Sequence, residues 1–567
     1  MSFFDTHLLS LVTFLPLVFA GLLAFLPSQE KGQLRAVTLI ALLIDLALGA
    51  MVWSRFDAAG PEFQLLFRAR WVDAIGLSYH VGVDGLAANL LLLTVVLGPI
   101  AVLASWTFVN ERVKEFHIAL LVLQTAMLGA VISLDVLLFY VFFEAMLVPM
   151  YLLVGVWGSE NRQMAAMKFF VYTLVGSLLM LVALIAVYLI ASPAGLRTFD
   201  YAAIYNGLLA ANQELAACRL DAAACAGLSD TASALQAYGP WLFGAFALAF
   251  AIKVPMFPVH TWLPDAHVQA PVAGSIVLAG VMLKMGTFGF WRYAIPLFPD
   301  AAASLRPLMA VLAVVGIVYG ALMCLAQRDV KKLIAYSSVS HMGYCMLGIF
   351  AFTGEGAAGS AFQMLAHGVA TGALFLLFGY LYERRHTRLM SDYGGIAKVM
   401  PVFTFFFLLT TFASIALPGT VGFVGEFLVL LGSFRSGLPL WISLLATTAV
   451  ILGAAYMLWM VQKVFFGPLT HAENHGLKDL SHRELVSMLP LAALILFMGL
   501  QPQPFLDKLA PSVERFVARA SVGLPHVQPV PAAQLRIQGA ELPSLIAAKP
   551  TAPGVLPLQA VAPASAR

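Results

Sequence analysis

Long apolar runs separated by short polar segments make up most of the chain from residue 7 to residue 501. Runs of about 18 residues or more are long enough to cross a bilayer as helices. The pattern therefore predicts an all-α polytopic membrane protein with about 14 transmembrane helices. The predicted spans are 7–26, 35–53, 85–108, 116–134, 136–157, 166–191, 239–270, 272–295, 303–326, 332–352, 359–382, 399–433, 438–465 and 484–501.

The first apolar run, HLLSLVTFLPLVFAGLLAFLP, invites comparison with a signal peptide. A secretory signal has a basic segment before its apolar stretch. No basic residue precedes this run, and many more spans follow it. We therefore interpret it as the first transmembrane helix.

Two of the predicted spans are over-long and interrupted. Pro255 and Pro258 interrupt span 7, and Pro418 with Gly419 interrupts span 12. Proline removes a helical hydrogen bond and frees backbone carbonyls at membrane depth. Interrupted helices at corresponding places in two halves are typical of transporters built from inverted repeats, with the ion path at the repeat interface. We predict two five-helix repeats, spans 4–8 and 9–13, the second inverted because five is an odd number.

This interpretation divides the chain into five parts. The predicted outer loop 192–238 belongs to the first repeat, and a short amphipathic helix is expected near 505–520, at the start of the C-terminal part. The rest of that part is Pro/Ala-rich and predicted to be solvated and disordered. The parts are N-terminal helices 1–3 (1–115), the first repeat (116–295), the second repeat (303–466), helix 14 (484–501) and the C-terminal tail (505–567).

Composition and charge support a membrane protein and set its orientation. The chain is 61% hydrophobic and only 11% charged, and its net charge of +3 gives no reason to expect a nucleic-acid partner. Sixteen Lys and Arg residues lie in or beside the odd-numbered connections, against eight for the even-numbered ones. The positive-inside rule then places both termini outside, on the periplasmic face of a bacterial inner membrane. Cys218 and Cys225 fall in an outer loop, where a disulfide and two free thiols are both open.

Six ionisable residues lie inside apolar runs, where a charge costs about 2.5–3.5 kcal/mol and usually marks an ion path. Each also has a structural alternative: a neutral, hydrogen-bonded carboxyl, a snorkelling lysine, a carboxylate at a helix N-terminus or a packed histidine. For Asp135, Asp265 and His267, near span ends, a surface role is equally open. The six residues are Glu144, Lys253, Lys284, His341, His367 and Glu426.

Motifs for bound cofactors are missing from the sequence. It has no dinucleotide-binding glycine pattern after a strand, no phosphate-binding loop and no C-x-x-C cluster for iron or zinc. We therefore expect neither a cofactor nor a metal in this chain. Its charge movement must be driven by a partner or by exchange for another ion.

Several motifs resemble the antiporter-like membrane subunits of respiratory complex I. They are GVDGLA with Asp84, FFEAMLVPMYLLVGVWG, KVPMFPVHTWLPDAHVQAPVAGSIVLAGVMLKMG, KKLIAYSSVSHMGY and LPGTVGFVGEF. The resemblance covers roughly residues 80–470. Sister subunits of that family typically carry a lysine where this chain has Glu426, and the largest sister has a long lateral helix where this chain has a short tail.

The resemblance implies proton translocation driven by electron transfer in partner subunits, which would hold NADH, FMN, iron–sulfur clusters and quinone. The expected partners are antiporter-like sister subunits on either side and the lipid bilayer. The residue roles it implies are Glu144 paired with Lys253 in a first half-channel, Lys284 as the link to a central axis, His341 and His367 along that axis, and Glu426 as the link to the outer side.

Two alternatives remain open at this point. Subunits of Mrp-type Na⁺/H⁺ antiporters and of membrane-bound hydrogenases resemble the same core. A scaffold without transport would tolerate neutralisation of Lys253 in everything except assembly.

Overall fold

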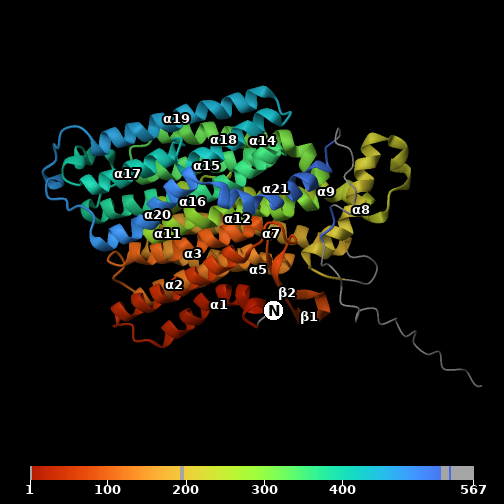
Figure 1. Ribbon diagram of the computed structural model, residues 1–567, viewed down its shortest axis with the longest axis horizontal. Coiled ribbons are helices and arrows are strands. Elements are labelled where there is room, and N and C mark those ends of the chain that lie inside the picture. The colour runs from red at the N-terminus through yellow and green to blue at the C-terminus, as the bar shows by residue number, and fades with distance from the viewer. Residues whose placement is uncertain (1–2, 192–196, 525–534, 538–567) are drawn as a thin grey trace, which may run out of the picture.

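Most helices of the protein run side by side along one direction (Figure 1). The computed structural model describes residues 3–191, 197–524 and 535–537. Within these residues, 13 helices or continuous helical segments are long and apolar enough to cross a membrane. They match 13 of the 14 predicted spans, and the remaining one is split into two shorter helices.

The unbroken spans follow the apolar runs to within a few residues at most ends. They are α1 (Phe3–Phe25), α2 (Lys31–Arg55), α3 (Gly85–Ser105), α4 (Val113–Ile132), α7 (Arg162–Ala191), α14 (Pro299–Leu325), α15 (Val330–Ala351), α16 (Gly354–Arg385), α19 (Leu440–Phe465) and α20 (His482–Leu500).

Both predicted interruptions are present. In span 7, α9 (Asp230–Lys253) ends two residues before Pro255, and α10 (Trp262–Gln269) begins after the break. In span 12, α17 (Pro401–Ser414) and α18 (Val421–Arg435) flank Pro418 and Gly419. Gly419 has a φ of 90°, a conformation that glycine adopts without a Cβ penalty. The prolines and this glycine thus end the helices where the sequence indicated.

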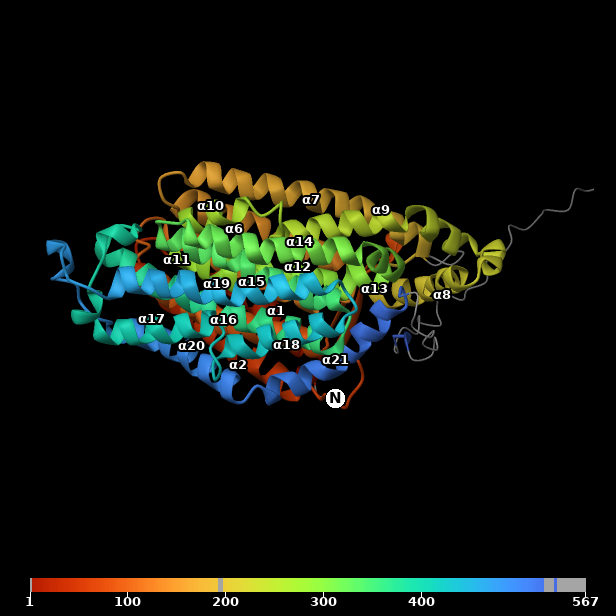
Figure 2. The same ribbon diagram turned by 90° about the horizontal axis from the view of Figure 1, so that it is seen from above.

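The span after the first break is the most deeply buried part of the fold. It runs from Val272 to Leu297 as α11 (Val272–Val277), α12 (Leu283–Gly289) and α13 (Ile295–Leu297), joined by the π-helical turns η3 (Leu278–Met282) and η4 (Phe290–Ala294). Its apolar window is entirely buried, as is that of α16, whereas α1, α2 and α19 bury well under half of theirs. The core therefore lies around α11–α13 and α16 (Figure 2). A further span is divided into α5 (Val136–Ala145) and α6 (Leu147–Trp157).

The all-α prediction missed a β-hairpin between spans 2 and 3. Strands β1 (Gln64–Val72) and β2 (Leu77–Val83) pair antiparallel. Ser78 on β2 donates to Asp135, which caps α5, and His80 contacts Asp200, which caps α8, at 2.6 Å. Burial alone would raise the pKa of Asp200, but the hydrogen bond and charge of His80 bring it below its ordinary value. The hairpin thus fixes the starts of two helices.

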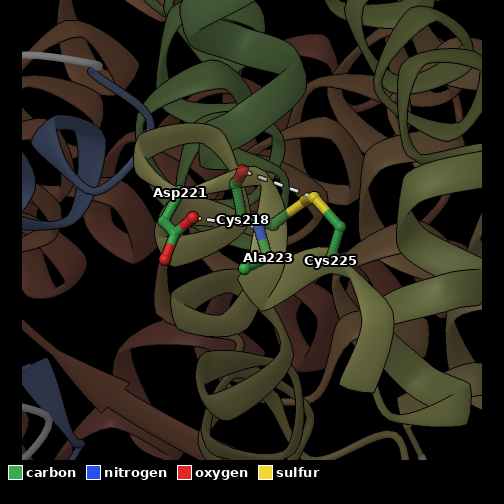
Figure 3. Close-up of a disulfide and its surroundings, with 4 residues drawn as sticks. All are labelled: Cys218, Asp221, Ala223 and Cys225. Carbon is green, nitrogen blue, oxygen red and sulfur yellow. Dashed lines mark hydrogen bonds between the residues drawn. A yellow bond between two sulfur atoms is a disulfide. The ribbon is translucent and has the colours of Figure 1, made fainter.

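The predicted outer loop 192–238 is largely helical, which corrects the sequence interpretation. It contains α8 (Tyr201–Leu220) and η2 (Ala222–Gly227), and α9 already begins at Asp230. Cys218 and Cys225 form a disulfide that joins the last turn of α8 to η2 (Figure 3). Alanine-rich polar sequence masked this helix, because its apolar pattern is too weak to resemble a span.

The amphipathic helix expected near 505–520 is present as α21 (Gln503–Ser521). Arg519 makes two hydrogen bonds to Glu62, at 2.6 and 2.7 Å, and Phe516 stacks on Trp291. Burial alone would lower the pKa of Arg519, but Glu62 raises it above its ordinary value. The predicted disorder of the remaining tail falls almost wholly outside the described residues.

Replacing Arg519 with Ala should destabilise the attachment of α21. The change leaves the Glu62 carboxylate, only 13% exposed, without its partner, and such a loss costs about 3–5 kcal/mol. We expect less chain in the assembled membrane complex and faster proteolysis at α21, measured by native gel and limited digestion. Glu514→Ala, at an exposed position of the same helix, is the control. Equal behaviour of the two variants would contradict the attachment role.

Candidate proton-transfer site

A polar axis crosses the most buried part of the fold. The Lys284 ammonium on α12 lies 2.7 Å from Nδ1 of His367 on α16 and also donates to the carbonyl of Ala279. Both side chains are fully buried. An ammonium at this depth is stable only with acceptors close by. The π turn η3 lies directly before Lys284 and supplies one of these, since Ala279 belongs to it.

A carboxylate continues the axis on the other side of α16. His341 on α15 contacts Oε1 of Glu426 through Nδ1 at 2.8 Å, and Gln363 donates to the same oxygen at 3.1 Å. The rings of His341 and His367 are 5.7 Å apart between centroids. Four of the six sequence-predicted residues are thereby brought together in the order Lys284, His367, His341, Glu426.

The break in span 12 shapes the end of this axis. Ser414, the last residue of α17, places its hydroxyl 3.4 Å from Nε2 of His341. Glu426 lies six residues into α18, beyond the break, and is buried. The interruption therefore brings a hydroxyl and a carboxyl from two half-helices to the same histidine.

The other two predicted residues lie apart from this axis. Lys253 is buried at the end of α9, and its Nζ lies 4.5 Å from the ring centroid of Phe143. Glu144, the next residue on α5, is half-buried and interacts electrostatically with Lys253. No ion pair joins Glu144 to Lys253 among the described residues. The expected pair is thus a through-space interaction beside an aromatic ring, and Glu144 lies nearer the protein surface than its apolar run indicated.

The three residues left open near span ends take different roles. Asp135 accepts hydrogen bonds from the backbone N–H groups of Leu137 and Leu138 as the cap of α5. Asp265 forms a partly exposed ion pair with Lys168 at 2.7 Å. His267 is fully buried and stacks on Phe375. Within the described residues, no group of three or more His, Cys, Asp or Glu could hold a metal ion.

Sequence reasoning missed two buried ionisable side chains. Arg292, at the end of the span that carries Lys284, pairs with Asp84 at 2.7 Å, and Asp84 also caps α3. Asp45 lies in the middle of α2 and is fully buried. Both interrupt apolar runs, in GFWRYAIP and ALLIDLALGA, so the depth criterion used for the other residues would have found them.

Comparison with known proteins shows the family to which the chain belongs. Residues 133–453 match the family model described as NADH:quinone oxidoreductase/Mrp antiporter, TM. The NADH-quinone oxidoreductase subunit M of Rhodobacter capsulatus is 43% identical over 519 residues, which cover 90% of this chain and 96% of the relative. The chain belongs to this family of NADH-quinone oxidoreductase subunits M. The choice of family made from the motifs is thereby confirmed.

Solved structures of the family and of its wider fold agree. A chain of respiratory complex I from Thermus thermophilus with bound NADH matches with a TM-score of 0.78 and 35% identity, covering 90% of this chain and 99% of that one. A chain of the Mrp complex from Dietzia sp. matches with a TM-score of 0.75 at 19% identity, covering 93% of this chain and 98% of that one. The second likeness shows that the fold is shared.

Gly286 on α12 packs directly against the backbone of α9, in the broken span 7. A Cβ at Gly286 would lie 2.6 Å from the carbonyl oxygen of Phe250 and 2.9 Å from the amide nitrogen of Val254. Gly286→Ala should therefore force α12 away from the end of α9 and reduce assembly or activity. Gly316→Ala, on α14 with no atom within 4 Å of the new methyl, is the matched control. A Gly286 variant that assembles and works like the control would refute this packing argument.

Proposed function

We propose that this chain translocates protons as a membrane-arm subunit of NADH-quinone oxidoreductase, through Lys284, His367, His341 and Glu426. The observation that carries the proposal is the pair of contacts at 2.7 and 2.8 Å, one at each end of a row of four buried titratable groups. Lysine, imidazole and carboxyl groups all exchange protons, and imidazole does so most readily near neutral pH. Electron transfer in partner subunits supplies the energy.

Direct contacts supply the first and the last of the three steps of the path. A proton on the Lys284 ammonium can pass directly to Nδ1 of His367, because the two nitrogens are at hydrogen-bond distance. His367 and His341 are too far apart for a direct bond, so this step requires a bridging water or a ring rotation. His341 then shares its proton with Glu426, whose second partner, Gln363, holds the carboxyl in place. Glu426 is the proposed link to the outer side.

Glu144 and Lys253 are the proposed first half of the path. The Lys253 ammonium is buried over the ring of Phe143. Glu144, the next residue along the chain after Phe143, is half-buried. A carboxyl at such a position can respond to a charge on a neighbouring subunit. When Glu144 is neutralised, Lys253 loses its counter-charge and releases its proton more easily. Sister subunits lie next to the chain in the assembled arm. A change of charge in one of them would in this way alter the proton affinity of Lys253.

The orientation in the membrane is also part of the proposal. The hairpin, α8 and the start of the chain lie toward one end of the helices (Figure 1). The loop charges favour the opposite end as the cytoplasmic one. The end with the hairpin is therefore assigned to the periplasmic face, which places both the start of α1 and α21 outside. The two antiporter-like repeats, 116–295 and 303–466, remain part of the same proposal.

Substitutions at Lys284 separate proton transfer from electrostatic support. Lys284→Ala removes the proton carrier, whereas Lys284→Arg keeps the positive charge but does not release a proton, because guanidinium stays protonated in proteins. Both variants should lose most NADH-driven proton pumping, measured with a pH-sensitive dye in vesicles and normalised to assembled complex. Glu426→Gln should behave alike, and Glu355→Gln, in an exposed ion pair, is the control.

The outcomes distinguish the competing functions. Normal pumping by both Lys284 variants would contradict proton transfer through this chain and favour the alternative of a scaffold without transport. Restoration by Arg alone would mean that charge suffices and that Lys284 carries no proton. Na⁺-dependent proton exchange by the purified chain in liposomes, with no partner subunit, would instead support the antiporter alternative.

The disulfide gives a test of orientation. The two unpaired cysteines, Cys324 and Cys345, are buried, so labelling of reduced thiols should report on Cys218 and Cys225. A membrane-impermeant reductant followed by an impermeant maleimide should modify the chain in intact spheroplasts. Inverted vesicles are the control and should remain unmodified. The reverse result would place α8 on the cytoplasmic side.

A further inference from the structure

A carboxyl group lies at membrane depth outside the Lys284–Glu426 axis. Asp45 is fourteen residues from the start of α2 and ten from its end, and its side chain is fully buried. It faces α4, where Gln124 donates an Nε2–H to Asp45 Oδ2 at 3.0 Å. Oδ1 of Asp45 has no hydrogen-bond partner within the described part of the chain. No cation pairs with this carboxyl in the same residues.

A purely structural role does not account for this choice of residue. An interhelical hydrogen bond to Gln124 needs only one acceptor oxygen, which an asparagine or a serine would also provide. A carboxylate adds a second buried oxygen and a charge, and an unpaired buried charge is costly. The cost disappears when Asp45 carries a proton, because the group is then neutral. The position therefore favours a carboxyl that binds and releases a proton.

Further polar groups lie between Asp45 and one end of the helices. His117 is on α4, two turns before Gln124 and on the same face, and it is buried with no partner at Nδ1 in the described residues. Arg35 on α2 interacts electrostatically with His117 and donates to the carbonyl of Val109 and to Asn110. Arg35 and Asn110 lie at the cytoplasmic end of the proposed orientation. A titratable group is thus placed between that end and the level of Asp45.

We propose that Asp45 is a second proton-binding site of this chain, loaded from the end that carries Arg35 by way of His117. The inference rests on the proposed function, since it assigns an additional proton site to a proton-translocating subunit. The reaction is a proton transfer only: water relays a proton from an N–H of neutral His117 to the Asp45 carboxylate, whose O–H bond forms, while the other ring nitrogen of His117 takes up a proton from the end that carries Arg35. The site uses α2 and α4, and it shares no residue with the axis of Lys284, His367, His341 and Glu426.

The experiment compares Asp45→Asn and Asp45→Glu in the assembled complex. Asparagine keeps the size and an acceptor for Gln124 but cannot carry a proton, whereas glutamate can. We expect Asp45→Asn to lose pumping at constant electron transfer, with loss of one protonated-carboxyl band in the infrared spectrum, and Asp45→Glu to keep both. Thr38→Ala, on the same buried face and bonded only to its own helix, is the control and should be unchanged.

The outcomes separate this inference from the proposed function. If Lys284→Ala abolishes pumping while Asp45→Asn pumps normally and keeps every carboxyl band, the second site is refuted and the main path stands. If Lys284→Ala pumps normally, the proposed function itself fails. Should Asp45→Asn not assemble, His117→Phe, which leaves Asp45 intact, still tests the route. Slower pumping with the carboxyl band retained supports the route, and unchanged pumping overturns it.

Discussion

The cost of an ammonium group inside a bilayer is the constraint on which this structure depends. Lys284 escapes that cost because α12 is surrounded by protein on all sides and a histidine and a carbonyl lie within reach of its charge. Such surroundings require outer helices that face the lipid in its place. The exposed apolar surfaces of α1, α2 and α19 supply this layer. The division into a polar centre and an apolar rim follows from the one charge.

Helix breaks and π turns are the means by which the fold places charges at depth. A regular helix uses all its carbonyls internally, so it offers none to a buried side chain. The turn η3 contains the carbonyl that Lys284 contacts, and the break before α18 brings Ser414 and Glu426 to one histidine. Irregular backbone here is therefore a consequence of the chemistry that the centre of the membrane must hold.

Hydropathy predicts this fold well because length and apolarity decide what crosses a membrane. It located thirteen spans, the two half-helices that replace the fourteenth and both interruptions, and the depth of charged residues indicated four groups that meet in space. It did not predict the hairpin, since strands outside the membrane give only a short, weak pattern, or α8, whose alanine-rich sequence resembles a loop. Hydropathy also did not predict which buried side chains contact each other. Lys253 lies over Phe143, and Arg292 meets Asp84 across 208 residues of chain, which no periodicity encodes.

The bond between Glu62 and Arg519 has a consequence for the order of biosynthesis. The two residues are 457 positions apart, and a ribosome adds about 5–20 residues per second. Glu62 therefore waits about 20–90 s for its partner while the twelve later spans are inserted. Glu62, which lies two residues before β1, stays without this partner during that interval. A product that ended before α21 would leave the Glu62 carboxylate, only 13% exposed in the complete fold, without its cation.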